Sequence, residues 1–226
     1  SGVVFNGSRI NSDQSRFSNS RNFVWIQADW GDADNSAFFQ NFSSYDEFLD
    51  LAFQLAREAD PDAKLFINEI FVGFSESTFD GLYRIVRGMV ERGTPIDGVG
   101  FQGHFVLGLP DKDALIERFQ AFADLGLSVE VTELDISINL FADGANGLVE
   151  QAQAYRDVYG ACTAVSSCVG VTVWNSNDGD TWLDTDATFG SQAPHKPTLF
   201  DENLVPKPAY YAVRDQVASV ILSSPE

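Results

Sequence analysis

The stretch LSVEVTELDI (Leu127–Ile136) decides the fold class of this chain. It is a short, largely apolar run, and such runs are typical of β-strands that are covered on both faces. Its end carries an acidic residue, Glu133, directly after the run of buried positions. Carboxylates are rarely buried without a partner. Glu133 is therefore a candidate functional group at the end of a buried strand.

Four other runs have the same character, and helical patterns separate them. The runs are Phe23–Trp30, Lys64–Ile70, Gly98–Phe105 and Cys168–Trp174. Strict alternation of strand and helix indicates an α/β fold with a parallel sheet, here with five β/α units. An open five-stranded sheet is the alternative, but such sheets often carry a Gly-rich phosphate-binding loop. No such loop is found in this sequence.

The helical segments are delimited by recognisable start and stop residues. The first begins with a capping box, Ser44-x-x-Glu47, and ends before Pro61. The second ends at Gly93, and the third runs from Pro110 to Gly126. Two more are predicted over Leu148–Val165 and Pro208–Ile221.

The chain divides into a short N-terminal part and one domain. Residues 1–22 are polar and have no periodicity, so we predict an arm or junction there. Residues 23–226 form the predicted domain. A closed (β/α)8 barrel needs eight units and usually ~250 residues. This chain holds five units, which leave two open parallel edges, and natural proteins cover or pair such edges.

Charge and composition exclude several classes of partner. The chain has 226 residues, 14 basic and 33 acidic, for a net charge of −19. That charge repels nucleic acid and anionic membranes, so neither is expected as a partner. No run reaches the ~18 apolar residues of a membrane span. No cofactor is expected, and no His/Cys/Asp cluster has the spacing of a metal site.

The two cysteines, Cys162 and Cys168, are close in sequence. Their spacing allows a disulfide between a helix end and the following strand, which is a feature of oxidising compartments. Two buried free thiols are the alternative. The disulfide hypothesis leads us to expect a secreted or extracellular protein.

Several motifs in order resemble glycoside hydrolase family 10, the retaining endo-β-1,4-xylanases. The resemblance extends from about Tyr45 to Ser219. The motifs that carry it are TPIDGVGFQGH (Thr94–His104), VTELD (Val131–Asp135), the segment Cys162–Trp174 and the segment Leu199–Tyr211. By this resemblance, the five units correspond to strands 4 to 8 of a TIM barrel, and the first three units are absent.

The resemblance implies roles for particular residues. Glu133 would be the nucleophile, which attacks the anomeric carbon and forms a covalent glycosyl-enzyme. His104 would orient it, and Gln102, two residues away, is expected on the same side of one strand. Asn68, Gln102, Trp174 and Trp182 would bind a β-1,4-linked polysaccharide, most simply xylan, with the tryptophans as platforms for sugar rings. The second histidine, His195, matches no family role and is expected at the surface.

The sequence departs from the family at the partner acid. The family's acid/base strand reads Trp-Asp-Val-Val-Asn-Glu, and over Trp25–Trp30 its final glutamate is replaced by Trp30. Asp29 is a weak candidate for a replacement acid, and Trp30 is a further candidate platform. The family pattern Asn-Asp-Tyr-Asn becomes Asn68-Glu69-Ile70-Phe71, which loses polar groups.

Three hypotheses follow from these departures. The chain is a xylanase-type enzyme with Glu133 as nucleophile, a catalytically inactive module that binds xylan or another β-glycan, or a fragment without a function of its own. The predicted open edges of the sheet favour association. Either a complementary barrel fragment supplies the first three units, or residues 1–22 and the partner of a homodimer cover the gap.

Overall fold

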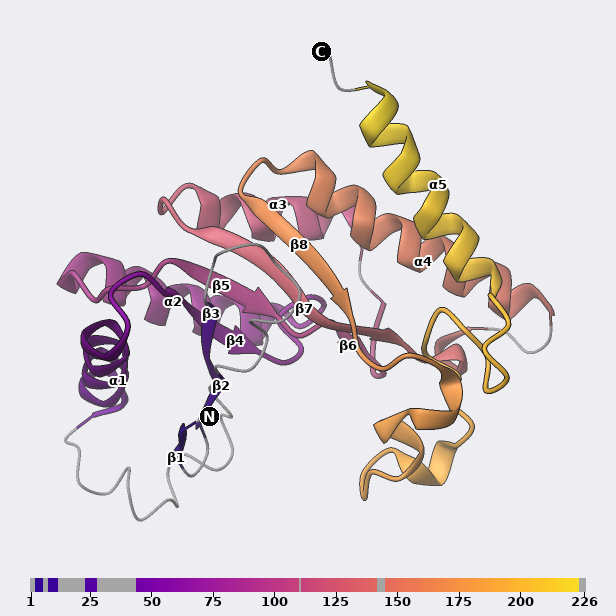
Figure 1. Cartoon of the computed structure of the whole chain (residues 1–226), viewed down its shortest axis with the longest axis horizontal. Coiled ribbons are helices and arrows are strands. Elements are labelled where there is room, and N and C mark those ends of the chain that lie inside the picture. The colour runs from indigo at the N-terminus through magenta and orange to yellow at the C-terminus, as the bar shows by residue number, and fades with distance from the viewer. Residues whose placement is uncertain are drawn as a thin grey trace.

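The computed structural model describes residues 3–5, 8–11, 23–27, 44–109, 111–141 and 145–223. Its centre is a parallel sheet with neighbouring strands in chain order, as Figure 1 shows. The strands are β3 (Phe23–Gln27), β4 (Lys64–Glu69), β5 (Gly98–Phe101), β7 (Ser128–Ile136) and β8 (Cys168–Val173). A short strand, β6 (His104–Phe105), pairs with the end of β7. The predicted α/β fold, a partial barrel, is confirmed.

Each parallel strand is followed by a helix, and the main apolar core lies between the strands and the helices. The helices are α1 (Tyr45–Ala59), α2 (Glu76–Arg92), α3 (Lys112–Ala123), α4 (Ala145–Ala164) and α5 (Pro208–Ser223). Figure 1 shows α5 lying against α4, with its C-terminal end projecting from the body. The strands are apolar because helices cover them, and the helices are amphipathic because one face of each packs on the apolar core, as the sequence indicated.

The helix boundaries follow from local capping. Ser44 Oγ accepts a hydrogen bond from the Glu47 backbone N–H at 3.1 Å and starts α1. Gly93, with φ of 77°, ends α2 and donates its N–H to the last carbonyls of the helix. The third helix has Asp111 as its N-cap, with Oδ1 3.0 Å from the Ala114 nitrogen. These local interactions explain why the predicted boundaries of the helices were nearly correct.

Two short strands occupy part of the stretch predicted as an arm. β1 (Val3–Phe5) and β2 (Ser8–Asn11) pair antiparallel, and β2 pairs antiparallel with β3. The absence of periodicity did not indicate these strands, because backbone pairing to an exposed strand does not require an apolar pattern. One of the two predicted open edges is therefore covered. Within the described ranges, β8 pairs with β7 alone.

The strand predicted over Gly98–Phe105 is interrupted at Gly103, which has φ of 83°. A Cβ atom at this position would lie 2.9 Å from a methyl carbon of Val131, so the close approach of the backbone to β7 requires glycine. β5 and β6 are therefore separate strands. The prediction that Gln102 and His104 share one side of a continuous strand is wrong.

The predicted disulfide is present. Cys162 in the last turn of α4 is bonded to Cys168, the first residue of β8, with their Cα atoms 5.2 Å apart. Across the described ranges, no helix combines the length and apolar character needed to cross a lipid bilayer.

Candidate active site

Two side chains contact the carboxylate of Glu133, one at each oxygen. Asn68 Nδ2 donates to Oε1 at 2.9 Å, and His104 Nε2 lies 3.3 Å from Oε2. The backbone N–H of Glu133 donates to the Gln102 carbonyl at 2.7 Å. The Glu133 side chain is 17% exposed, so it still reaches solvent. The two contacts thus fix the orientation of the carboxylate, which stays accessible to a ligand.

These groups come from β4, β6 and β7, and they meet towards the carboxyl end of the sheet. Asn68 lies near the end of β4, His104 begins β6, and Glu133 lies in the last half of β7. Thr132 Oγ1 donates to Asn68 Oδ1 at 2.7 Å, which turns the amide so that its nitrogen faces Glu133. In parallel α/β folds, ligands bind at this end of the strands.

His104 lies between two carboxylates. Burial favours its neutral form, but hydrogen bonds to Asp135 and Glu133 and the charges of these two residues outweigh burial and raise the pKa of His104 to about 9. The imidazole is therefore charged at neutral pH, with both ring nitrogens acting as donors. It fixes the position of Glu133 and compensates part of the negative charge.

Asp135 is a site residue that the sequence analysis did not single out. It is fully buried, with Oδ1 2.9 Å from His104 Nδ1 and Oδ2 accepting from Trp182 Nε1 at 2.9 Å. One signal was available, because an acidic residue two positions after Glu133 interrupts an apolar run. Its partners could not be predicted, since Trp182 lies 47 residues away.

The two tryptophans predicted as platforms both lie beside His104. The Trp182 ring packs edge-on to the imidazole at 4.9 Å between ring centroids, and the Trp174 ring does so at 6.1 Å. Both are partly exposed. Trp174 and Trp182 therefore lie beside His104, which itself contacts Glu133.

The remaining predicted site residues are Gln102, Asp29 and Trp30. Gln102 is only 2% exposed, and its Nε2 has no hydrogen-bond partner among the described residues. Asp29 and Trp30 lie outside the described residues, and with them the position of the partner acid.

His195 is not at the surface. It is fully buried, with Nδ1 2.8 Å from Ser137 Oγ and Nε2 3.0 Å from the Phe189 carbonyl. The expectation of exposure, based on the polar loop around it, is wrong. The loop folds back over the end of β7, where the His195 carbonyl accepts from the Ile138 N–H at 2.8 Å.

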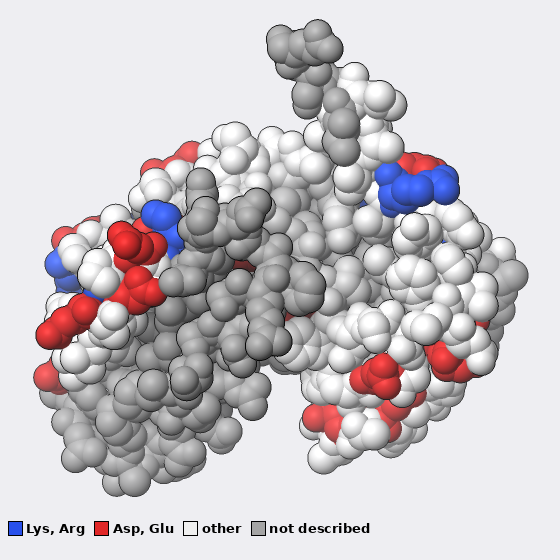
Figure 2. All heavy atoms as spheres, in the orientation of Figure 1, with Lys and Arg blue, Asp and Glu red and all other residues white. Residues whose placement is uncertain are grey.

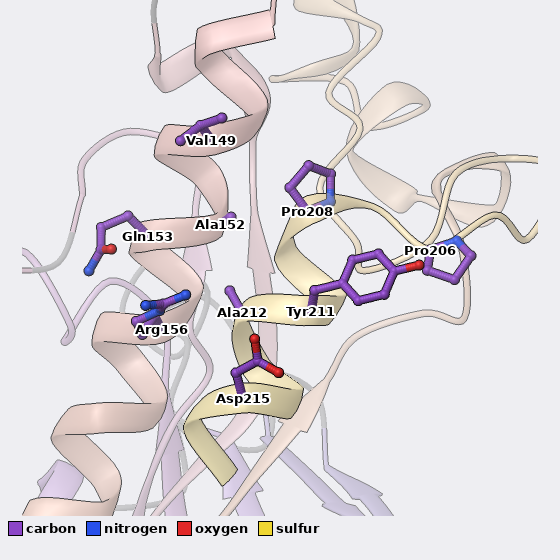
Figure 3. A pocket seen from close by; sticks show the side chains of 9 residues that line it. All are labelled: Val149, Ala152, Gln153, Arg156, Pro206, Pro208, Tyr211, Ala212 and Asp215. Carbon is purple, nitrogen blue, oxygen red and sulfur yellow. The ribbon is translucent and has the colours of Figure 1, made fainter. Parts of the chain in front are cut away.

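A groove of about 600 Å³ lies elsewhere, between α4 and α5 (Figure 3). Its lining includes Val149, Arg156, Tyr211 and Asp215, but neither Glu133 nor its partners. It is formed by the outer helices and is separate from the strand ends.

The surface charge agrees with the composition. On the face shown in Figure 2, the few basic side chains lie beside acidic ones and form no extended basic patch among the coloured residues. The described part of the chain also contains no group of three His, Cys, Asp or Glu side chains arranged to hold a metal ion.

A family model, "Glycosyl hydrolase family 10", matches residues 24–216. The chain belongs to this family. Endo-1,4-beta-xylanase 5 of Pyricularia oryzae is 38% identical over 180 residues, which cover 79% of this chain and 44% of the relative. Endo-1,4-beta-xylanase of Agaricus bisporus is 38% identical over 181 residues, covering 80% of this chain and 52% of the relative.

Solved structures of family members share the fold. Native xylanase 10B of Thermotoga maritima superposes with a TM-score of 0.74 at 28% identity, covering 84% of this chain and 57% of that one. Xylanase 10B of Thermotoga petrophila, in complex with xylobiose, superposes with a TM-score of 0.72 at 28% identity, covering 83% and 55%. The family 10 chain described here spans about half the length of the relatives and structures that it matches.

Proposed function

We propose that this domain binds a β-1,4-linked polysaccharide of the xylan type and carries Glu133 as the nucleophile of a retaining hydrolysis. The observation that supports this most is the arrangement around Glu133, in which Asn68 and His104 each donate to one carboxylate oxygen. A nucleophile fixed from two sides is pre-oriented for attack on the anomeric carbon.

The first step would form a bond between a Glu133 oxygen and the anomeric carbon, while the bond to the leaving sugar oxygen breaks. His104 and Asn68 hold the carboxylate, and the aromatic faces of Trp174 and Trp182 offer apolar surface to sugar rings. The leaving oxygen also needs a proton, and by the resemblance Trp30 takes the position of the family's acid. Since general acid catalysis contributes roughly 10²–10⁴-fold, we expect hydrolysis of unactivated xylan to be slow.

An aryl xylobioside with a good leaving group tests this proposal, because its departure needs little protonation. We expect release of the aryl group with slow or undetectable hydrolysis of xylan, and a covalent glycosyl adduct on Glu133 that mass spectrometry detects. Brisk release of oligosaccharides from xylan would show that an acid is present, with Asp29 as the first candidate.

A catalytically inactive binding module is the second candidate. The sequence feature that favours it is Trp30, which by the resemblance replaces the catalytic acid with an aromatic side chain. Retention on insoluble xylan, with no turnover of either the polysaccharide or the aryl xylobioside, would decide for the module.

The state of association is part of the same proposal. Strand β8 pairs on one edge only within the described ranges, and Val169 on it is 52% exposed. Uncovered edges favour pairing with another chain, so we propose a homodimer or a complex with a complementary barrel fragment. Light scattering that shows a monomer at all concentrations would contradict the homodimer.

We also propose an extracellular location, because the disulfide is a feature of oxidising compartments.

A further inference from the structure

Phe71 has a backbone conformation that its side chain disfavours. Its φ is 63°, in the left-handed region, where a bulky aromatic residue is a genuine outlier. Phe71 lies two residues after the end of β4, close in sequence to Asn68, which contacts Glu133. Residues held in such conformations cluster at ligand-binding and active sites, and persist only where the surroundings hold them.

Two kinds of interaction hold Phe71 in place. Its carbonyl accepts hydrogen bonds from the backbone N–H groups of Phe74 at 3.2 Å and Ser75 at 2.9 Å, which form the turn before α2. Its ring lies 5.4 Å from the ring of Phe74. The main chain is therefore fixed by the turn, and the side chain is directed by packing.

The side chain of Phe71 packs against a small apolar cluster that is separate from the main core. The cluster consists of Val106, Leu183 and Phe189, and the other partly buried residue on it is Trp182. Phe71 and Trp182 thus share one apolar support, and both keep part of their surface exposed. Trp182 itself donates a hydrogen bond to Asp135 and packs against His104.

We propose that Phe71 is an additional aromatic platform of this chain, which contacts the C–H face of a pyranose ring next to the ring held at Trp182. This inference rests on the proposed function, because it names one more contact of the same ligand. The exposed part of an aromatic side chain offers a flat apolar surface to such a face.

The sequence adds a second argument. Asparagine and glycine tolerate the left-handed region at position 71 far better than phenylalanine does. In this chain phenylalanine stands there despite the strain. A phenylalanine that served only to fill the small cluster would be replaceable by another apolar side chain without loss of ligand affinity.

The experiment compares matched variants by calorimetric titration with xylotriose. Phe71→Asn removes the ring and relieves the backbone strain, and Phe71→Tyr keeps the ring. Leu204→Asn is the control, because Leu204 has the same φ of 63° but is 62% exposed and lies in the loop before α5. Thermal unfolding of each variant checks that the fold is retained.

We expect Phe71→Asn to weaken binding about 2- to 10-fold, the effect of losing one stacked ring. Phe71→Tyr and Leu204→Asn should bind as the unchanged chain does. Equal affinity of Phe71→Asn and the unchanged chain would overturn the inference and leave the proposed function intact. Absence of xylotriose binding by the unchanged chain would overturn the proposed function, and the inference with it.

A second variant covers the case in which Phe71→Asn does not fold. Phe71→Leu keeps an apolar side chain against the small cluster but has no flat ring. Reduced affinity of this variant supports the platform, whereas unchanged affinity shows that Phe71 only fills the cluster and overturns the inference.

Discussion

Two glutamates lie three residues apart on β7, and their surroundings differ completely. Glu133 receives a hydrogen bond from Asn68 and another from His104. Glu130 has a buried Oε2 without a hydrogen-bond partner in the described part of the chain, and burial raises its pKa to about 7. Both are partly buried acids on one strand. Burial alone therefore does not distinguish the candidate nucleophile from the other carboxylate.

The neighbouring strands explain the difference. Glu130 is level with Gly100 on β5 and with Gly170 on β8, and neither glycine has a side chain that could donate. Glu133 lies further along, where side chains from β4 and β6 reach it. The contrast teaches that the polar side chains at the strand ends, and not the strand itself, define the site.

The largest expected effect separates the two glutamates by activity. Glu133→Gln should lower the hydrolysis of an aryl xylobioside by at least about 10³-fold, because the amide is not a nucleophile. Glu130→Gln should leave the rate within about 3-fold, since this side chain contacts none of the reacting groups. Steady-state kinetics on both variants measure this. Similar losses of activity in the two variants would contradict a role that Glu133 has and Glu130 lacks.

The next effect concerns the groups that hold Glu133. Asp135→Asn removes a charge that raises the pKa of His104, so His104 should lose its proton at a lower pH. In the unchanged chain, activity should persist through neutral pH and fall as pH rises through about 9. The variant should lose activity about 10- to 100-fold at pH 8 and show an alkaline limb at lower pH. An alkaline limb at the same pH would show that Asp135 does not act through His104.

A stability measurement examines the other glutamate. The folded-state pKa of Glu130 is raised from 4.5 to about 7, so the folded chain binds a proton that the unfolded chain has already released between these values. This contribution is present below about pH 4.5 and is lost as pH rises through 7. We therefore compare the free energy of unfolding of Glu130→Gln with that of the unchanged chain. The difference should favour the variant by about 1–3 kcal/mol more at pH 8 than at pH 5. Urea unfolding at both pH values measures it, and parallel changes in both proteins would contradict the prediction.

The smallest effect tests the role of the glycines. A Cβ atom at Gly170 would lie 3.4 Å from Glu130 Oε1, so Gly170→Ser can place a hydroxyl donor beside the carboxylate. We expect the pKa of Glu130 to fall towards its ordinary value and stability at pH 8 to rise by less than about 1 kcal/mol. Carboxyl-carbon NMR titration reports the pKa. Gly170→Ala is the control, since it adds the same carbon without a donor and should not lower the pKa.

Much of the fold could be predicted because its causes are local. Ser44 and Gly93 mark helix ends through their own backbone bonds, and the strands are continuous apolar runs. The interruption at Gly103 was missed because it depends on the approach of β7, which is distant in sequence. The burial of His195 was missed for a similar reason, since its partner Ser137 is 58 residues away in the sequence, just after β7, and only Phe189 lies in the same connection.

The sequence by itself determined that a carboxylate lies on a buried strand, in a chain of five alternating β/α units. Periodicity, capping residues and motifs act over a few residues, so they can be recognised without coordinates. Only the tertiary structure decided which carboxylate has partners, because Asn68 is 65 residues from Glu133 and His104 is 29 residues away. Parallel strands bring such groups together at one edge, and no local pattern records which side chains meet there.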